Sequence, residues 1–205
     1  MEASNVTVMG NEVLSKAYMI RNFGEEAYKK ADEIKSLNVD CYEINIFTGM
    51  LDERSLHKEI VDFVGNPAFI DLSLLRNDKL LSKNDYKDIE VGNNQDRKRI
   101  LKLAYKNSKG ILDFKLQEFM LEQMEWLDDY SLYMSAREFI KVDSFDEWKI
   151  YKGNHPENVD KIRNDFEEEI NYQIFVQYEF HKQWRNLKNY FGDLGIKAKR
   201  VLKVF

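Results

Sequence analysis

The chain has 205 residues, of which 43% are hydrophobic and 33% charged, and it contains 13 Phe, 11 Tyr and 3 Trp. This length suits one domain that buries roughly 70% of the surface of its unfolded chain, and the composition excludes intrinsic disorder. A formal net charge of -5, with the two signs interleaved, argues against nucleic acid or an anionic membrane as a partner.

The cysteine usage and the apolar runs indicate the cellular setting. Cys41 is the single cysteine, so an internal disulfide is excluded, and its apolar neighbours predict a buried, unreactive thiol. Polar residues such as Glu2 and Glu12 interrupt any secretory signal, and no apolar run approaches the ~20 residues of a membrane span. We therefore expect a cytoplasmic protein without a membrane partner.

The first fifty residues read as strand, helix and strand. Asn5–Met9 is short and β-branched, which predicts a strand that ends at Gly10-Asn11. Asn22 followed by Glu25 is typical of a helix start. Cys41–Phe47 is again strand-like. This order predicts a right-handed βαβ unit with parallel strands over residues 1–50.

Helical periodicity dominates from residue 51 to residue 190. The two prolines, Pro67 and Pro156, mark loops, and residues 152–156 read as a surface loop. We predict a last helix from 157 to 190 that is apolar on several sides, which is typical of a helix packed between neighbours. Residues 195–205 are strand-like. The prediction is a single domain, 1–205, of α/β class, with three parallel strands and a helical subdomain (51–190) between the second and third.

Two segments in the helical part have distinctive sequences. They are Glu125–Met134, with the sequence EWLDDYSLYM, and Phe175–Trp184, with the sequence FVQYEFHKQW, which Leu194–Lys197 follows. Together they resemble amylomaltase, the 4-α-glucanotransferase of maltodextrin metabolism. Phe145–Trp148 stands where the family has a Trp-x-x-Trp pair.

The N-terminal third carries two further blocks of the same resemblance. Asn22–Tyr28 is similar to the family's Asp-Phe-Gly-Lys-Glu-Ala-Tyr, and Gly65–Leu72 is similar to its Gly-Asn-Pro-Tyr-Phe-Ile-Asp-Leu. The distance between the blocks is preserved. In the family, a mostly helical subdomain separates strands two and three of a (β/α)8 barrel, so the resemblance implies a partial, truncated barrel start.

The chain departs from the family pattern where barrel enzymes place their functional residues, at the C-terminal ends of strands. Val13–Arg21 replaces the family's Ser-Leu-Pro-Ser-Pro-Tyr-Gly-Ile-Gly, and Lys199–Leu202 replaces Gly-Asp-Ile-Pro. Asp52 and His57 stand at the positions of two glucan-facing tyrosines. The reactive carboxylates of the family come from strands later than the third, so the resemblance implies a catalytically inactive protein, a pseudoenzyme.

Other carboxylates of the chain are poor substitutes for that pair. Retaining glucan transfer needs two carboxyl groups about 5 Å apart on either side of the scissile bond. Asp128 and Asp129 are adjacent on a predicted helix and point about 100° apart, so we interpret them as a helix cap and a solvated partner. Glu167–Glu169 reads as an exposed helix face.

The histidines and tryptophans also have structural interpretations. His57, His155 and His181 lie in separate segments without metal-ligand spacing, and we expect surface or hydrogen-bonded boundary positions for them. Trp126, Trp148 and Trp184 could stack on sugars, but their helical positions favour core packing. We therefore predict no catalytic, cofactor-binding or metal-binding residue, and we assign no substrate-binding residue.

Several functions stay open at this point. We favour an inactive amylomaltase-like protein with a scaffold or interaction role, which binds a second copy or another protein through the open edge of its third strand. One alternative is 4-α-glucanotransferase activity on maltodextrins, with the missing strands supplied by a second chain. A second is a non-catalytic glucan-binding module, which the loss of both tyrosines disfavours. A third is a non-functional remnant.

Overall fold

Helices make up most of the part of the chain that the computed structural model describes, which is residues 7–9, 12–14, 20–37, 41–47, 63–87, 94–142 and 144–203. The α-helices are α1 (Glu25–Ser36), α3 (Leu72–Asn77), α4 (Asn94–Ser108), α5 (Asp113–Glu122), α6 (Leu127–Ile140), α7 (Phe145–Asn154), α8 (Pro156–Asp165) and α9 (Glu167–Asp193). Two short 3-10 turns are η1 (Pro67–Phe69) and η2 (Lys83–Asp85). The strands are β1 (Thr7–Met9), β2 (Glu12–Leu14), β3 (Cys41–Phe47) and β4 (Lys197–Lys203).

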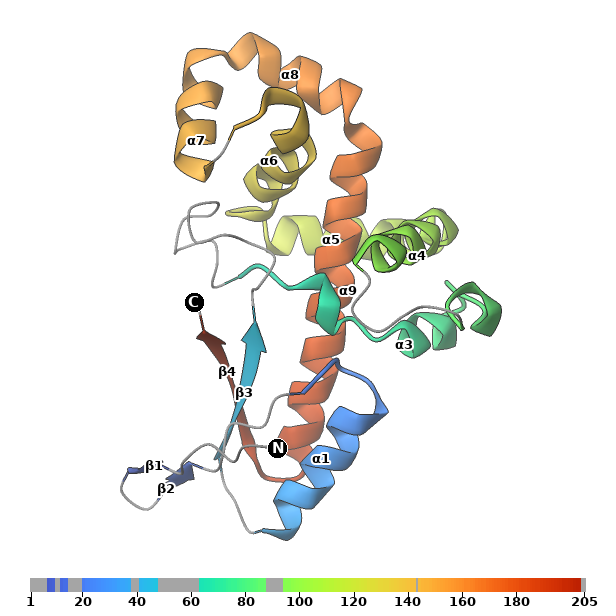
Figure 1. The fold of residues 1–205 in the computed structure, drawn as a ribbon, viewed down its shortest axis with the longest axis vertical. Helices are drawn as coiled ribbons and strands as arrows, with labels where there is room; N and C mark the ends of the chain where they lie inside the picture. The colour runs from blue at the N-terminus through green and yellow to red at the C-terminus, as the bar shows by residue number, and fades with distance from the viewer. Residues whose placement is uncertain are drawn as a thin grey trace.

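The 27-residue helix α9 is the axis on which the other elements pack. It runs along the long dimension of the molecule, with α6, α7 and α8 at one end and α1, β3 and β4 at the other (Figure 1). Its buried residues lie on several sides: Ile170, Tyr172, Ile174, Phe175, Val176, Gln177, Glu179, Phe180, Gln183, Leu187 and Phe191. A helix with this pattern has neighbours all round it, as the sequence predicts.

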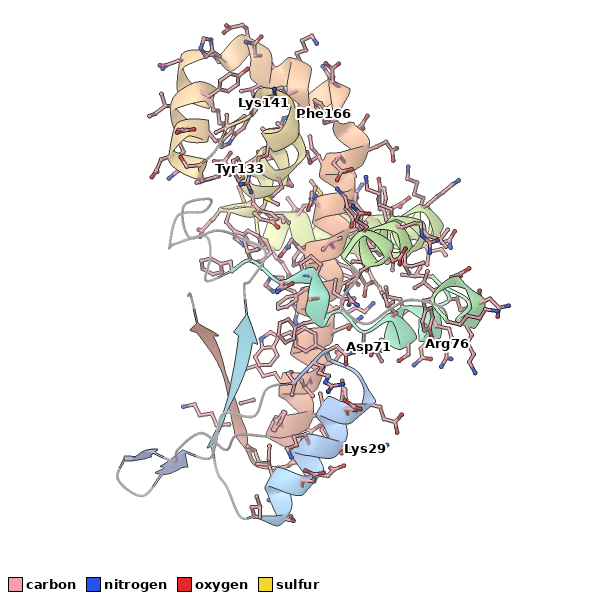
Figure 2. All side chains as sticks on the ribbon, in the orientation of Figure 1. Lys29, Asp71, Arg76, Tyr133, Lys141 and Phe166 are labelled. Atoms are coloured by element: carbon pink, nitrogen blue, oxygen red, sulfur yellow. The ribbon has the colours of Figure 1, made fainter. Side chains whose placement is uncertain are left out.

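Two clusters of buried side chains line α9. The cluster at its C-terminal end joins α1, the 65–81 segment and α4, and includes Phe23, Ile70, Leu101, Phe175 and Phe180. The cluster at its N-terminal end joins α6, α7 and α8, and includes Tyr133, Phe145, Trp148, Ile162 and Ile174. Figure 2 labels Tyr133 in the α6–α8 region, and Asp71 near the start of α1 in the other region.

Side-chain caps determine where several helices begin. The carboxylate of Asp71 accepts hydrogen bonds from the backbone N–H groups of Ser73 and Leu74 and so caps α3. The hydroxyl of Ser144 accepts from the N–H of Glu147 at the start of α7. Each such bond satisfies an N–H group that has no partner within its helix.

The expected fold class, a barrel start made of three parallel strands, is wrong for the described residues. The strands are short and form one mixed sheet in the order β1-β2-β3-β4. The first pair is antiparallel, with Thr7 opposite Leu14, and β2 pairs with β3 at a single position, Leu14 opposite Cys41. Extended parallel pairing occurs between β3 and β4, from Cys41 opposite Lys197 to Phe47 opposite Lys203. These few strands close no barrel, and the prediction missed β2 altogether.

Two boundaries in the helical region also differ from the prediction. The expected helix 157–190 is two helices, α8 and α9, which meet at Phe166. The expected loop 152–156 is reduced to His155, because α7 continues to Asn154 and Pro156 begins α8. Proline is well accepted at the first position of a helix, since the N–H that it lacks would have no helical partner there. No helix in the described residues is long and apolar enough to cross a membrane.

Candidate functional site: a cavity beside a clamped segment

The segment Gly65–Asp71, here called the clamped segment, is held by side chains of α9. The amide of Gln177 accepts from the backbone N–H of Gly65 (2.7 Å) and donates to its carbonyl (3.0 Å). Gln183 does the same at Asp71, with distances of 2.8 Å to the N–H and 3.3 Å to the carbonyl oxygen. Two buried glutamines therefore satisfy the backbone N–H and C=O groups at both ends of this segment, as a neighbouring strand would do in a sheet.

Arg97 of α4 holds the middle of the clamped segment from another side. Its Nε donates to the carbonyl of Pro67 at 3.0 Å, and a terminal nitrogen donates to the carbonyl of Ile70. Burial lowers the pKa of Arg97, and the nearby Asp71 carboxylate opposes that effect. The backbone of the segment is thus fixed between α4 and α9.

Close packing leaves room only for glycine at the start of the clamped segment. A Cβ on Gly65 would lie 2.1 Å from the ring of Phe180. The N–H of Phe23 donates to the carbonyl of Phe69 at 2.9 Å, and the rings of Phe23 and Phe180 lie 5.1 Å apart. The blocks 22–28 and 65–72 of the family resemblance therefore contact each other, and both contact the third block, 175–184.

A cavity of about 290 Å³ lies between the clamped segment and the helices α4, α6 and α9. Its wall is largely aliphatic. Residues of the clamped segment, two tyrosines and several polar residues complete the lining: Val64, Gly65, Asn66, Pro67, Ala68, Gln95, Arg97, Lys98, Leu101, Tyr130, Met134, Tyr172, Gln173 and Val176. An apolar pocket with a few polar groups is the usual form of a small-molecule site.

Tyr130 and Tyr172 bring hydrogen-bond donors to this cavity. The hydroxyl of Tyr130 accepts from the amide of Gln177 at 3.3 Å, which leaves its own proton without an acceptor in the described part of the chain. The hydroxyl of Tyr172 has no hydrogen bond to any described residue. Burial raises the pKa of both phenols, so both keep their protons at neutral pH.

The structure places Asp128 and Asp129 in ion pairs at the start of α6. Asp128 pairs with Arg163 of α8 at 2.7 Å, and this hydrogen bond lowers the pKa of the carboxyl. Asp129 contacts the ammonium of Lys152 of α7. The two carboxylates thus link α6 to two different helices, and neither lines the cavity.

The glutamates at the start of α9 lie on its outer surface and bind lysines of α4 and of the turn after it. Glu168 pairs with Lys109 at 2.7 Å, and Glu169 pairs with Lys102 at 2.5 Å. The hydrogen bond from Lys109 lowers the pKa of Glu168. The predicted exposed face is therefore also an electrostatic contact between α9 and its neighbours.

The described histidines occupy boundary and surface positions. The Nε2 atom of His181 lies 2.9 Å from the carbonyl oxygen of Phe63, and the ring contacts Trp126 and Phe119. His155 is half-exposed and lies 3.8 Å from Glu157. Within the described residues, no group of three His, Cys, Asp or Glu side chains could hold a metal ion.

The tryptophans pack in the core. Trp148 is fully buried, and Trp126 is buried with its Nε1 donating to Gln123 at 2.9 Å. Trp184 is partly buried against the ring of Phe23, at 5.9 Å between centroids. Asp52, His57 and the side chains of Cys41 and Lys199–Leu202 lie outside the described residues.

One carboxylate pair escaped the sequence analysis. Asp78 and Glu179 both contact the ammonium of Lys182, at 2.7 and 2.8 Å. Burial raises the pKa of Glu179 against the opposing pull of Lys182. Because the lysine lies between the two carboxylates and Glu179 is fully buried, the pair has a structural role.

The cavity and its clamp also escaped the sequence analysis. Gln177 and Gln183 stand among apolar residues of α9, and a polar side chain on such a face was the available signal. It points to a buried hydrogen-bond partner, because an unpaired buried amide is costly. That partner lies more than a hundred residues away in the sequence, so periodicity alone could not identify it.

Comparison with known proteins agrees with the resemblance. A model of the 4-alpha-glucanotransferase family matches residues 13–205. The 4-alpha-glucanotransferase of Clostridium butyricum is 32% identical over 88% of this chain and 39% of its own length. That of Aquifex aeolicus is 27% identical over 94% of this chain and 41% of its own length.

A solved structure extends the comparison to three dimensions. Amylomaltase from Streptococcus agalactiae in complex with acarbose superposes with a TM-score of 0.74 and 25% identity, covering 90% of this chain and 42% of that protein. The chain thus spans about two fifths of the length of these relatives. With a family match over nearly all its residues, the chain belongs to the 4-alpha-glucanotransferase family, in its amylomaltase-like branch.

Proposed function

We propose that these 205 residues are the scaffold part of an amylomaltase-like protein and do not transfer glucan on their own. The observation that carries this proposal is the placement of the described carboxylates. Among the residues that the structure describes, no Asp or Glu lines the cavity. Asp128, Asp129, Glu168 and Glu169 are engaged by lysine or arginine, and Glu179 is buried against Lys182.

This arrangement does not supply the chemistry of retaining transfer. That reaction uses one carboxylate as nucleophile and a second carboxyl group as acid and base, both open to the sugar. A carboxylate in an ion pair with a neighbouring helix serves packing, and its basic partner would have to leave before a sugar could approach. In this proposal the described residues therefore provide a scaffold and a contact surface, and they carry no reacting group.

We propose β4 as the contact surface of the scaffold. In the described sheet β4 pairs with β3 over seven positions and forms the outer strand on that side. An outer strand carries backbone N–H and C=O groups that can pair with a further strand. Its occupant in this proposal is a polypeptide that carries the remaining strands of the family fold. The proposal keeps the predicted cytoplasmic location, which the single cysteine supports.

The same surface favours one alternative, 4-α-glucanotransferase activity on maltodextrins that is restored when a second polypeptide supplies the missing strands. The supporting observation is the coverage of about two fifths of the Clostridium butyricum relative. Both versions predict docking at β4, and they differ in whether docking produces catalysis.

Maltotriose disproportionation separates the two versions. The chain is assayed alone, and again after mixing with the part of the Clostridium butyricum relative that lies beyond the matched region. We expect no glucose release from the chain alone. Release after mixing would favour the alternative, whereas a stable complex without release would support the scaffold role. Turnover by the purified chain alone would refute the proposal. Light scattering of each sample reports whether the complex forms.

A further inference from the structure

We propose that the cavity between the clamped segment and α4, α6 and α9 binds a neutral cyclic molecule that places an acceptor oxygen against the hydroxyls of Tyr130 and Tyr172. This inference concerns a cavity that no described residue of β4 lines, and it does not depend on glucan transfer.

The size of the cavity limits the ligand to one or two rings. Its volume is about 290 Å³. An apolar protein cavity of about 150 Å³ is large enough to bind benzene, so this one has room for a bicyclic molecule or a disaccharide fragment. Gln95 and Lys98, which are exposed, lie at its mouth and leave a route of entry.

The wall selects a ligand with much C–H surface. Val64, Leu101 and Val176 are each 1% exposed and form the aliphatic part of the lining with Met134 and Pro67. A molecule that presents ring C–H groups to this wall loses little hydration there. A hydroxyl pressed against the same wall would lose its hydrogen bonds to water, which costs free energy.

The two tyrosine hydroxyls favour a ligand that carries a hydrogen-bond acceptor at one edge. Tyr130 and Tyr172 are 3% and 5% exposed, and each has a proton without an acceptor among the described residues. They come from different helices, α6 and α9, so the fold brings two unused donors to one small space. Both residues line the cavity, so an oxygen of a bound ligand could accept a hydrogen bond from their hydroxyls.

The charges around the cavity favour a neutral ligand. None of the described lining residues is an Asp or a Glu, which disfavours a cation. Arg97 already donates to the carbonyls of Pro67 and Ile70, and Lys98 lies 4.0 Å from Glu169. Both cationic groups therefore already have polar or charged partners within the protein.

Binding would strengthen the contact between the clamped segment and three helices, because the ligand would touch all of them. A ligand that binds only the folded state raises the unfolding temperature as its concentration exceeds its dissociation constant. Thermal unfolding is therefore a direct readout, and saturation-transfer NMR of the ligand is a second.

The experiment uses two neutral probes, coumarin and maltose, with the full chain. Coumarin is an aromatic bicycle with a carbonyl acceptor, and maltose is a pair of saturated rings. Tyr130→Phe and Tyr172→Phe each remove one donor, and we expect either to weaken binding about threefold to tenfold. Ala68→Leu fills the cavity from its wall and should abolish binding. Tyr190→Phe is the matched control, because Tyr190 donates to Asp32 on the exposed side of α1, outside the cavity.

The outcomes are distinct. Binding of either probe that Ala68→Leu abolishes and that either cavity Tyr→Phe variant weakens supports the proposal, and the probe that binds identifies the ring as aromatic or saturated. Circular dichroism checks that each variant is folded. Binding of neither probe at about 10 mM, or binding that all three cavity variants leave unchanged, overturns the proposal.

Discussion

The two ends of α9 are held in different ways. Around the clamped segment, side chains from α4 and α9 hydrogen-bond to backbone groups, through Arg97, Gln177 and Gln183. Around α6, α7 and α8, the contacts are between side chains: rings, such as Tyr133 with Phe145 at 5.3 Å and Trp148 with Tyr151 at 5.8 Å, and the ion pairs of Asp128 and Asp129.

This difference follows from the local backbone. Apart from the three-residue turn η1, the clamped segment has no helix or strand, so its buried N–H and C=O groups need side-chain partners. The backbone groups of α6, α7 and α8 are largely satisfied within each helix, so these helices pack through side chains alone, by ring contacts and by the ion pairs of Asp128 and Asp129. Hydrogen bonds are directional and fix both the position and the orientation of the clamped segment. Contacts between rings fix the distance between two helices but tolerate several angles between the rings.

The largest expected effect is at the ring-packed end. Trp148→Ala should lower the free energy of unfolding by about 4 kcal/mol, because it removes a fully buried indole and leaves a cavity. Urea denaturation at constant pH measures the change. Ile150→Ala, on the exposed side of the same helix, should cost less than about 1 kcal/mol. Equal costs for the two variants would contradict the assignment of Trp148 to the core.

The next effect is at the clamped end. Gln177→Leu should lower the free energy of unfolding by about 3 kcal/mol, because it leaves the N–H and carbonyl of Gly65 buried without partners. Gln173→Leu, one turn earlier on α9 and less buried, is the control, with an expected cost below about 1 kcal/mol. If Gln177→Leu left the free energy of unfolding unchanged, the hydrogen bonds of Gln177 to Gly65 would contribute nothing to stability.

A smaller effect is expected from Gly65→Ala. The added methyl group would overlap the ring of Phe180, and the resulting strain should cost about 2 kcal/mol. Gly153→Ala is the control, since a Cβ there meets nothing within 4 Å. Combining Gly65→Ala with Phe180→Leu makes room for the methyl group, so the double variant should lose less than the sum of the two single changes. If the losses of the two single variants simply added in the double variant, Gly65 and the Phe180 ring would not be in contact.

The smallest expected effect is a change in pH dependence. Burial raises the pKa of Glu179 in the folded protein above the unfolded value, although Lys182 opposes this and Asp78 adds to it. The folded state therefore holds this proton more tightly. The stabilisation is fully present below the unfolded pKa, near 4.5, and is lost as the pH rises through the folded pKa.

Glu179→Gln removes this titration. The stability of the variant relative to the parent should therefore increase as the pH rises above about 4.5, as a series of urea denaturations at increasing pH would measure. Parallel profiles for Glu179→Gln and the parent chain would show that this carboxyl is not perturbed by folding.

The family was accessible from the sequence because its signal lies in contiguous blocks. Glu125–Met134, Phe175–Trp184, Asn22–Tyr28 and Gly65–Leu72 are short segments whose residues can be read in order. In the structure the four blocks meet along α9, which explains why they resemble the family together. The prediction of a barrel start failed because pairing between strands depends on distant residues, and β2 is too short to show a period.

What the sequence by itself determined was local: the helical periodicity, the helix start after Asn22, the burial of the tryptophans and the family. The tertiary structure decided the clamp, the cavity and the pairing of carboxylates with particular lysines and arginines. Gln177 and Gly65 are separated by 112 positions, yet they form one hydrogen-bonded unit. The physical reason is that periodicity reports which face of a helix is buried, whereas a buried polar group also needs a specific partner, and only folding brings that partner near.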